Sequence, residues 1–215
     1  MALEIERKYL GVDFDRLRQA LVGADAKDRG AHFESNMVFD TPDRRLFATG
    51  RLLRVRRQEW REGTRCVLTL KLPAAPAVPG EFKTREEREL HVENDMTMGR
   101  VLEGLGFAVV ARYEKVRSVW EVASPAGSAL VELDELPFAR VVEVEGDPRA
   151  LDAVAARLGL DKHEISTKSY HALHQEWRSA QGLPPQTSFV FGPEEWQRLR
   201  RHIGLPAQGR LCPKS

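Results

Sequence analysis

The sequence has few cysteines, and they do not form a pair with metal-binding spacing. Only Cys66 and Cys212 occur in the 215 residues, far apart along the chain. A disulfide-stapled fold or a zinc module would need more cysteines at short intervals, so both are excluded. This cysteine usage fits a reducing compartment.

Long hydrophobic runs are also missing. A membrane-spanning helix needs about 18 or more consecutive apolar residues, and the chain has no such run. Charged residues begin at Glu4, which leaves no apolar stretch for a secretory signal. We therefore expect a soluble, cytoplasmic protein that does not act at a membrane.

Neither sign of charge is in excess. The 33 lysines and arginines are balanced by 32 aspartates and glutamates, which leaves a net charge of +1. We therefore expect no general attraction to nucleic acid or to an acidic surface. The GxxxxGK[ST] motif is absent too, which excludes a P-loop.

What the chain does have is a series of short segments in which charged and apolar residues alternate. Successive side chains of a β-strand point to opposite faces, so each segment would have one charged and one apolar face. In the first segment, MALEIERKYL, Glu4, Glu6 and Lys8 share one face while Ile5 and Tyr9 lie on the other. Six more segments follow this pattern: residues 50–57, 64–72, 83–92, 115–122, 128–136 and 140–146.

The charged faces group like charges two residues apart. The basic positions are Arg54 with Arg56, Lys71 alone, and Lys115 with Arg117. Arg85 precedes an acidic pair on its own strand, and the acidic pairs are Glu87 with Glu89, Glu132 with Asp134, and Glu143 with Glu145.

Other segments predict helices and loops. Asp13 is a candidate N-cap for a helix carrying Phe14, Leu17 and Leu21, and Asp147-Pro148 is a clear helix start. Further helices are expected at residues 95–105 and 166–177, and a loop at 73–81. After a Gly-Leu-Pro-Pro linker, the tail holds one short helix beginning at Pro193.

Two arrangements of such strands are open. A sheet could cover a core with its apolar face and expose its charges, or it could close into a barrel with the charges inside. Amphipathic helices favour the barrel, because they need an apolar outer surface to cover. A charged interior is costly if it is dry and unpaired. It becomes reasonable if it holds water, divalent cations and a highly charged anion, since carboxylates suit Mg²⁺ or Mn²⁺ and basic pairs suit phosphate.

These residues, in this order, resemble the CYTH superfamily, the triphosphate tunnel metalloenzymes. Glu4, Glu6 and Lys8 match the family's Glu-x-Glu-x-Lys signature, and the charged strands quoted above follow the family's later pattern in order. The segment FDTPDRRL at residues 39–46 and the Lys-Ser-Tyr at 168–170 are also similar to family members. The resemblance implies an α+β fold: an eight-stranded antiparallel β-barrel tunnel with helices outside. It covers residues 1–178 as the tunnel domain and leaves 179–215 as an appendage.

The resemblance also implies roles for individual residues. Triphosphate would be held by Lys8, Arg54, Arg56, Lys71, Arg85, Lys115, Arg117 and Lys168. Mg²⁺ or Mn²⁺ would be bound mainly by Glu4, Glu6, Glu143 and Glu145, with Glu132 and Asp134 as further ligands. Catalysis would fall to Glu6, Lys8, Glu87 and Glu89, the three glutamates being candidates for the general base.

Three functions remain open from the sequence. The first is hydrolysis of a small-molecule triphosphate, and the second is cyclisation of ATP to cyclic AMP and pyrophosphate, as in class IV adenylate cyclases. The third is a binding module without catalysis, which is the least favoured because four acidic pairs are present: the three given above and Glu4 with Glu6. A homodimer is also left open. Some hydrolases of this family pair the N-terminal lysine with a tyrosine after the first helix, but no tyrosine lies between Tyr9 and Tyr113 here.

A few residues outside the charged strands carry smaller expectations. Cys66 lies on the apolar face of its strand and is expected to be a buried structural thiol. His171 and His174 share one side of a predicted helix without nearby metal-ligand partners, and we expect them to face solvent. Trp120 and Trp177 are interpreted as packing residues.

Overall fold

The computed structural model describes residues 2–74 and 81–206. The strands are β1 (Ala2–Leu10), β2 (Lys27–Asp40), β3 (Leu52–Trp60), β4 (Gly63–Pro73), β5 (Lys83–Val92), β6 (Ala108–Ser124), β7 (Gly127–Glu135), β8 (Arg140–Gly146) and β9 (Glu164–Ser166). The helices are α1 (Phe14–Gly23), α2 (Arg45–Ala48), α3 (Asp95–Gly104), α4 (Pro148–Arg157), α5 (Tyr170–Ala180) and α6 (Pro193–His202). Most of the predicted loop at 73–81 lies outside the described residues.

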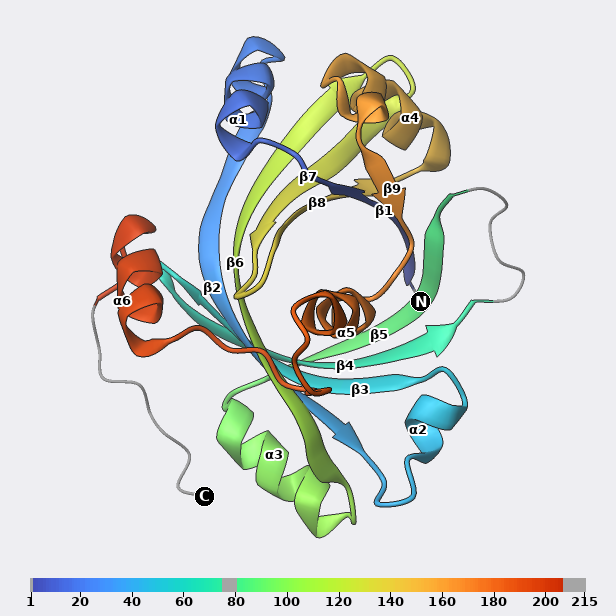
Figure 1. Cartoon of the computed structure of the whole chain (residues 1–215), viewed down its shortest axis with the longest axis vertical. Coiled ribbons are helices and arrows are strands. Elements are labelled where there is room, and N and C mark those ends of the chain that lie inside the picture. Colours follow the sequence, from blue (N-terminus) through green and yellow to red (C-terminus); the bar gives the residue numbers. More distant parts are fainter. Residues whose placement is uncertain (1, 75–80, 207–215) are drawn as a thin grey trace.

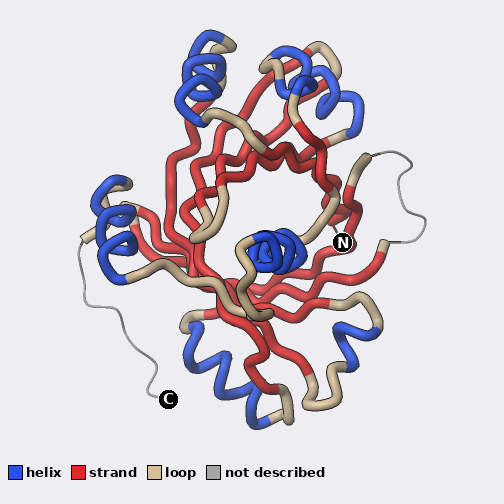
Figure 2. Tube along the Cα trace, in the orientation of Figure 1, coloured by secondary structure: helices blue, strands red, loops and turns tan. Residues whose placement is uncertain are grey.

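Eight of the strands form a closed antiparallel barrel, as predicted (Figure 1). Around the ring their order is β1-β5-β4-β3-β2-β6-β7-β8, and β1 closes it by pairing with both β5 and β8. Residues 2–6 of β1 pair with β5, while residues 6–10 pair with β8. The short β9 adds three pairs along residues 8–10 of β1. Helices lie around the strand ring (Figure 2).

Strand β2 is the main element that the sequence did not predict. It pairs with β3 on one side and with β6 on the other, so the barrel cannot close without it. Its pairing with β6 is irregular between Asp28 and Ala31, where Gly30 has a φ of 91°. Its inner face carries a histidine, a glutamate and an asparagine in place of a pair of like charges, so the charge pattern that marks the other strands is missing.

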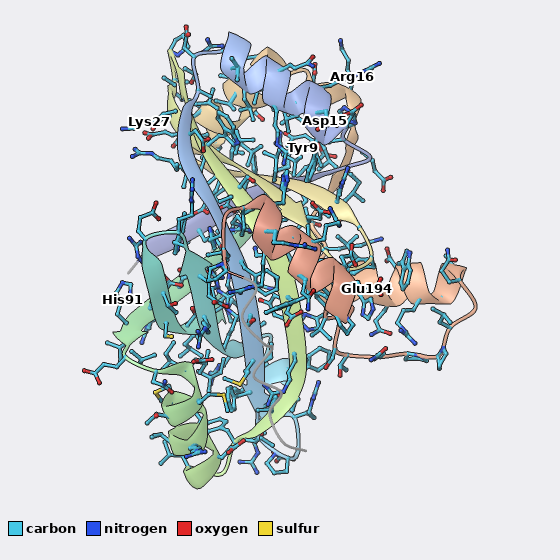
Figure 3. The ribbon with its side chains drawn as sticks, turned by 90° about the vertical axis from the view of Figure 1, so that its left-hand side faces the viewer. Tyr9, Asp15, Arg16, Lys27, His91 and Glu194 are labelled. Atoms are coloured by element: carbon cyan, nitrogen blue, oxygen red, sulfur yellow. The ribbon has the colours of Figure 1, made fainter. Side chains whose placement is uncertain are left out.

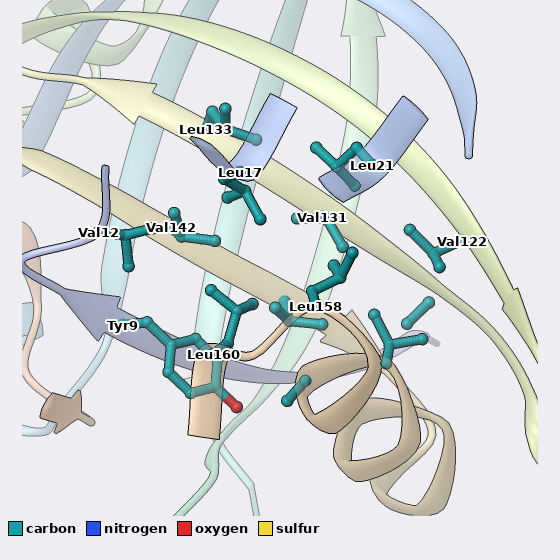
Figure 4. Close-up of a cluster of buried hydrophobic side chains, with 14 of the residues drawn as sticks. Tyr9, Val12, Leu17, Leu21, Val122, Val131, Leu133, Val142, Leu158 and Leu160 are labelled. Carbon is teal, nitrogen blue, oxygen red and sulfur yellow. The ribbon is translucent and has the colours of Figure 1, made fainter. Parts of the chain in front are cut away.

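The apolar faces of the strands point outward and are covered by helices, which confirms the predicted arrangement. Leu17 and Leu21 of α1 pack in one cluster with Val131 and Val142 of the barrel wall (Figure 4). Burying each such side chain stabilises the fold by about 2 kcal/mol. The Asp13 side chain accepts hydrogen bonds from the Asp15 and Arg16 backbone N–H groups and so caps α1, as predicted.

A second cluster covers another part of the wall. Leu102 of α3 packs with Met37, Phe39 and Leu53. Cys66 is buried on this side of the molecule, as expected. Helices α1, α3 and α4 therefore shield parts of the outer face of the ring from water.

Helix α6, which carries the labelled Glu194, lies in front of the barrel wall in the view of Figure 3. Trp196 and Leu199 of this helix pack in one cluster with Phe33 and Val116. The Arg200 side chain is 2% exposed and donates to both carboxylate oxygens of Glu59 at 2.8 and 3.0 Å. The helix predicted at Pro193 is therefore present. The division into a domain at 1–178 and an appendage at 179–215 stays a prediction.

Helix α5 lies over one end of the ring, in the centre of the view of Figure 1. It begins at Tyr170, later than predicted, because Glu164–Ser166 forms β9 and Ser169 caps the helix. The expectation that its histidines face solvent was wrong. His171 is half-buried, its Nε2 is buried, and its ring packs edge-on to Tyr113 and Phe189. The second histidine, His174, is still more deeply buried. That residue is 3% exposed and packs against Phe138, Trp177 and Phe189.

Within the described residues, no helix combines the length and apolar character needed to cross a membrane.

Candidate functional site

Charged side chains from all eight barrel strands meet in the barrel interior. Ion pairs between strands that are not neighbours demonstrate this, because such pairs must span the lumen. Lys71 of β4 reaches Glu4 of β1 past β5, and Arg117 of β6 reaches Glu143 of β8 past β7. Neighbouring strands add further charges of both signs. The interior groups are Glu4, Glu6, Lys8, Glu34, Arg54, Arg56, Lys71, Lys83, Glu87, Lys115, Arg117, Glu132, Asp134, Glu143 and Glu145.

Lys8 is a buried cation held between two carboxylates. Its Nζ atom lies 2.5 Å from Oε1 of Glu6 and 2.8 Å from Oε1 of Glu143. Burial alone would lower the pKa of Lys8, but Glu143 and Glu6 outweigh it and raise the pKa. Glu6 also accepts from Lys83 at 2.5 Å. The first charged strand therefore faces the interior, and its lysine stays protonated at neutral pH.

Arg117, Lys115 and Asp134 form a second buried group. Arg117 Nε donates to Asp134 Oδ1 at 2.7 Å, and Lys115 Nζ donates to Oδ2 at 2.9 Å. The Tyr170 hydroxyl donates to Oδ2 as well, at 2.5 Å. Arg117 also pairs with Glu132 and with Glu143. Asp134 is fully buried, with both carboxylate oxygens engaged by donors.

Lys71 forms a third group with two carboxylates from different strands. Its Nζ atom lies 3.0 and 2.8 Å from the two carboxylate oxygens of Glu4, and it also pairs with Glu87. Burial tends to lower the pKa of Lys71, and so does Arg54, but Glu4 and Glu87 outweigh both and raise it. The lysine that the sequence placed alone on its strand therefore also lies among the interior charges.

Arg54 differs from these cations. It is 4% exposed, and its Nη1 donates to the Tyr113 hydroxyl at 2.8 Å. Its Nε and Nη2 are buried and have no hydrogen-bond partner within residues 2–74 and 81–206. A buried donor without an acceptor costs about 1–3 kcal/mol, and more when the group is charged, so such donors usually mark a place for a ligand or water. Arg54 can therefore accept an anion without giving up a partner.

The carboxylates of β1 and β8 are candidates to hold a metal ion. Glu6 and Glu145 are directly opposite in register. Burial and the nearby Glu4, Glu6 and Glu143 raise the pKa of Glu145 to about 7 despite the opposing effect of Arg117. Within the described ranges no three acidic, histidine or cysteine side chains are already arranged as a ligand cluster. Lysines pair with several of the carboxylates, among them Glu6 and Glu4. The donor chemistry still fits Mg²⁺ or Mn²⁺: all the ligands are hard oxygens, and Glu145 lies in a surplus of negative charge.

Burial raises the pKa of Glu132 to about 8. Asp134 and Glu143 add to the rise, while Arg117 and Lys115 oppose it. Glu132 and Asp134 thus lie among the interior charges, but Asp134 is already saturated with donors. This makes Glu132 the better placed of the two to act as a further ligand.

Three of the predicted site residues are exposed or half-buried and lie at the edge of the charged barrel interior. Lys168 is 53% exposed and pairs with Glu176. Glu89 is exposed and accepts a hydrogen bond from Thr69 at 2.9 Å. Arg85 is half-buried and lies opposite Glu4 in the β1–β5 register.

The structure adds interior residues that the sequence did not indicate. Glu34 of β2 is fully buried within 3.5 Å of Arg56 and Lys115, and His32 lies 2.9 Å from it. The two were missed because the strand itself was not predicted. Tyr113 and Tyr170 reach the interior from β6 and α5. Tyr170 belongs to the Lys-Ser-Tyr segment, but nothing in the sequence shows which way its side chain points.

Comparisons with known proteins identify a matching family and several similar structures. A family model described as the CYTH domain matches residues 2–170. Among solved structures, a Vibrio parahaemolyticus protein named as a candidate adenylate cyclase is 21% identical, with a TM-score of 0.67 over 80% of this chain and 97% of that one. The PH1819 protein of Pyrococcus horikoshii is 21% identical, with a TM-score of 0.64 over 80% and 98%.

A third structure is a Hippeastrum protein, HpAC1, named as a candidate adenylyl cyclase with a dominant triphosphatase activity. It is 22% identical, with a TM-score of 0.58 over 87% of this chain and 100% of that one. No curated protein matches in sequence. At these identities the structural likeness shows the fold alone.

Proposed function

Because the chain belongs to the CYTH domain family, we propose that it hydrolyses the terminal phosphate of an inorganic or organic triphosphate inside the barrel. The observation that carries this proposal is Arg54, a buried guanidinium with two N–H donors that lack a partner in the described parts of the chain. Phosphate oxygens suit such a planar set of donors. A triphosphate would satisfy them without removing an existing bond.

The other cations would hold the rest of the phosphate chain. Their positions around the ring let them contact oxygens from several sides, which neutralises and orients the chain. We propose that the binding set comprises Lys8, Arg54, Arg56, Lys71, Arg85, Lys115 and Arg117, with Lys168 as an outer contact at the α5 end. To bind, phosphate oxygens would replace carboxylates at several of these cations.

Hydrolysis requires a water in line with the terminal phosphorus. The water oxygen bonds to phosphorus, the bridging P–O bond breaks, and a carboxylate takes the proton. Glu6, Glu87 and Glu89 are the proposed bases, and their placement favours Glu6 and Glu87, which lie among the interior cations. Burial tends to raise the pKa of Glu87, but Glu4, Lys71 and Arg54 together lower it, so Glu87 is ionised at neutral pH. Lys8, beside Glu6, would stabilise charge on the transferred phosphoryl group.

Glu4, Glu6, Glu143 and Glu145 would hold Mg²⁺ or Mn²⁺, with Glu132 and Asp134 as outer members of the set. When bound, the ion supplies positive charge that stabilises the phosphate oxygens. Carboxylates displaced from Lys8 and Lys71 by the phosphate chain would be free to serve as these ligands. Metal and triphosphate would therefore suit the same site together.

The alternative is cyclisation of ATP, in which the ribose 3′-hydroxyl attacks in place of water. The names of the Vibrio and Hippeastrum proteins favour testing it. Cyclisation would bind the triphosphate through the same interior cations but would also require a site for adenine and ribose.

The test is to incubate the protein with Mg²⁺ or Mn²⁺ and, in separate tubes, tripolyphosphate, thiamine triphosphate and ATP. Released orthophosphate, cyclic AMP and pyrophosphate are then measured. We expect orthophosphate from at least one substrate. Glu87→Gln and Glu6→Gln should each lower kcat by about 10²-fold or more if that carboxylate is the base. Glu86→Gln is the matched control, because Glu86 lies on the outer face and pairs with Arg88.

Formation of cyclic AMP with equimolar pyrophosphate would show that the protein cyclises ATP and would overturn the proposed hydrolysis. Binding of tripolyphosphate without any turnover would leave the chain as a binding module. Equal losses in Glu86→Gln and Glu87→Gln would show that the effect is on folding and not on the base.

A further inference from the structure

The charged interior ends in an apolar zone at the end where α5 lies. Leu10 and Val38 follow the interior residues Lys8 and Asn36 by two positions in their strands, so they continue the same inward faces, and Leu136 comes directly after the end of β7. Val141 precedes the interior residue Glu143 by two positions on β8. Because β8 runs antiparallel to β1 and β7, Val141 also continues an inward face at this end. Because adjacent strands are antiparallel, all of these apolar residues lie at one end of the ring.

Helix α5 packs on this zone through its first turn. Leu173 lies in a cluster with Tyr113, Leu136 and Val141, to which Phe189 also belongs. Leu10, Val38 and Tyr170 pack against the same cluster. The first turn of α5 thus rests directly above the boundary between apolar and charged interior residues.

Tyr170, the first residue of α5, crosses that boundary. Its hydroxyl donates to Asp134 Oδ2 at 2.5 Å. Its ring centroid lies 5.3 Å from Nζ of Lys8 and 5.5 Å from Nζ of Lys115. One side chain therefore touches a buried carboxylate and two buried ammonium groups that come from three different strands.

These contacts differ in kind from those of the interior carboxylates. An aromatic ring attracts an ammonium group through its quadrupole but does not neutralise it. The ring therefore positions Lys8 and Lys115 without adding to the neutralisation that their carboxylate partners already provide. The Tyr170 hydroxyl donates to Asp134 and so helps to fix the position of that carboxylate. Asp134 is then less able to move with the ammonium groups of Lys8 and Lys115 when they bind an anion. Burial and Asp134 raise the pKa of Tyr170 well above its usual value, so the hydroxyl stays a donor.

We propose that Tyr170 is a positioning residue for Lys8 and Lys115, and that it couples binding of a phosphate chain in the barrel to docking of α5 on the barrel end. The ligand class rests on the proposed function. The coupling does not require turnover, because it concerns where the two ammonium groups lie when the chain binds. A bound phosphate chain would fix Lys8 and Lys115, and through the ring of Tyr170 it would hold the start of α5 more firmly.

The test separates the ring from the hydroxyl. Tyr170→Phe keeps the ring and loses the bond to Asp134, whereas Tyr170→Leu loses both. Tripolyphosphate affinity, measured by titration calorimetry, should weaken by about tenfold in Tyr170→Leu and clearly less in Tyr170→Phe, because the cation–π contacts depend on the ring. Tyr9→Phe and Tyr9→Leu are the matched controls. Tyr9 is also buried, but it faces outward and its hydroxyl accepts from Arg7.

A second readout addresses α5 directly. Hydrogen exchange of the α5 backbone amides should slow on addition of tripolyphosphate in the wild type and in Tyr170→Phe, but not in Tyr170→Leu. Where Tyr170→Leu remains folded by circular dichroism, a wild-type affinity together with the wild-type slowing of α5 exchange on addition of tripolyphosphate would overturn the proposal. Equal losses of affinity in the Tyr9 variants would overturn it too, because the effect would then be general. Binding of tripolyphosphate with these effects, but no orthophosphate release from tripolyphosphate, thiamine triphosphate or ATP, would disprove the proposed function and leave this inference standing.

Discussion

Lys8 and Glu143 lie directly opposite each other on β1 and β8, with the lysine Nζ 2.8 Å from the glutamate Oε1. Both are buried inside the ring, where an unpaired charge is costly. The pair shows how this barrel tolerates a charged interior: its cations and carboxylates neutralise one another. An anionic ligand that binds these cations must therefore take the place of the carboxylates that pair with them.

The first prediction concerns this pair. Lys8→Met leaves Glu143 with Arg117 as its remaining partner and should lower the free energy of unfolding by about 3 kcal/mol, at the low end for a broken buried pair. Adding Glu143→Gln should restore most of that stability, because it removes the charge of the carboxylate that lost its lysine, while Glu6 keeps Lys83 as a partner. Urea unfolding of the single and double variants measures both effects. A double variant no more stable than Lys8→Met would show that the two residues are not energetically coupled.

A second prediction concerns pH and His171 on α5. Burial, together with His174 and Arg44, lowers the pKa of His171 to about 4 from the usual 6.5. The unfolded chain therefore binds a proton at this residue at a higher pH than the folded chain does. It follows that stability falls as the pH drops from about 7 toward 4.

His171→Phe should flatten this dependence, because phenylalanine suits the edge-on contacts with Tyr113 and Phe189 and does not titrate. Urea midpoints measured across the pH range would show the change of slope. His202→Phe, at an exposed position on α6, is the control and should keep the wild-type slope. If His171→Phe retained that slope as well, the acid sensitivity would come from other groups.

The third prediction separates stability from binding. Arg200 of α6 is buried and bonded to both oxygens of Glu59. Arg200→Met should lower the free energy of unfolding by about 3 kcal/mol through the loss of this pair. Tripolyphosphate affinity should not change, because Glu59 lies on the outer face of β3. A weaker affinity in a folded Arg200→Met protein would show that α6 influences the interior.

Much of the fold could be predicted from the sequence, because alternation fixes which side chains share a face of a strand. Arg54 with Arg56, and Glu143 with Glu145, are examples whose inward direction followed from the pattern and from the helices that must cover the other face. Strand β2 could not be predicted in this way, since His32, Glu34 and Asn36 do not alternate as like charges. Only its pairing with β3 and β6 reveals it.

The sequence predicted which charged residues lie in the barrel interior better than it predicted which partners they contact. Sequence placed Lys8, Lys71 and Arg117 among the interior groups, but it could not show which carboxylate each one meets across the lumen. It also could not show that Lys168 is exposed or that Tyr170 points inward. The exposure of Lys168 and the inward direction of Tyr170 depend on where α5 begins and how it packs. The Ser169 cap is a local signal, but the packing of Leu173 on the barrel end is a tertiary contact that the sequence does not show.

The most direct test of the central claim is to measure tripolyphosphate binding by titration calorimetry in Arg54→Met and Arg51→Met. Arg54 is the buried guanidinium with free donors, whereas Arg51 is exposed three residues earlier in the chain. If the barrel interior binds the phosphate chain, Arg54→Met should weaken binding by about tenfold or more, while Arg51→Met binds like the wild type. Equal binding by all three proteins would contradict the account, because the phosphate chain would then lie elsewhere.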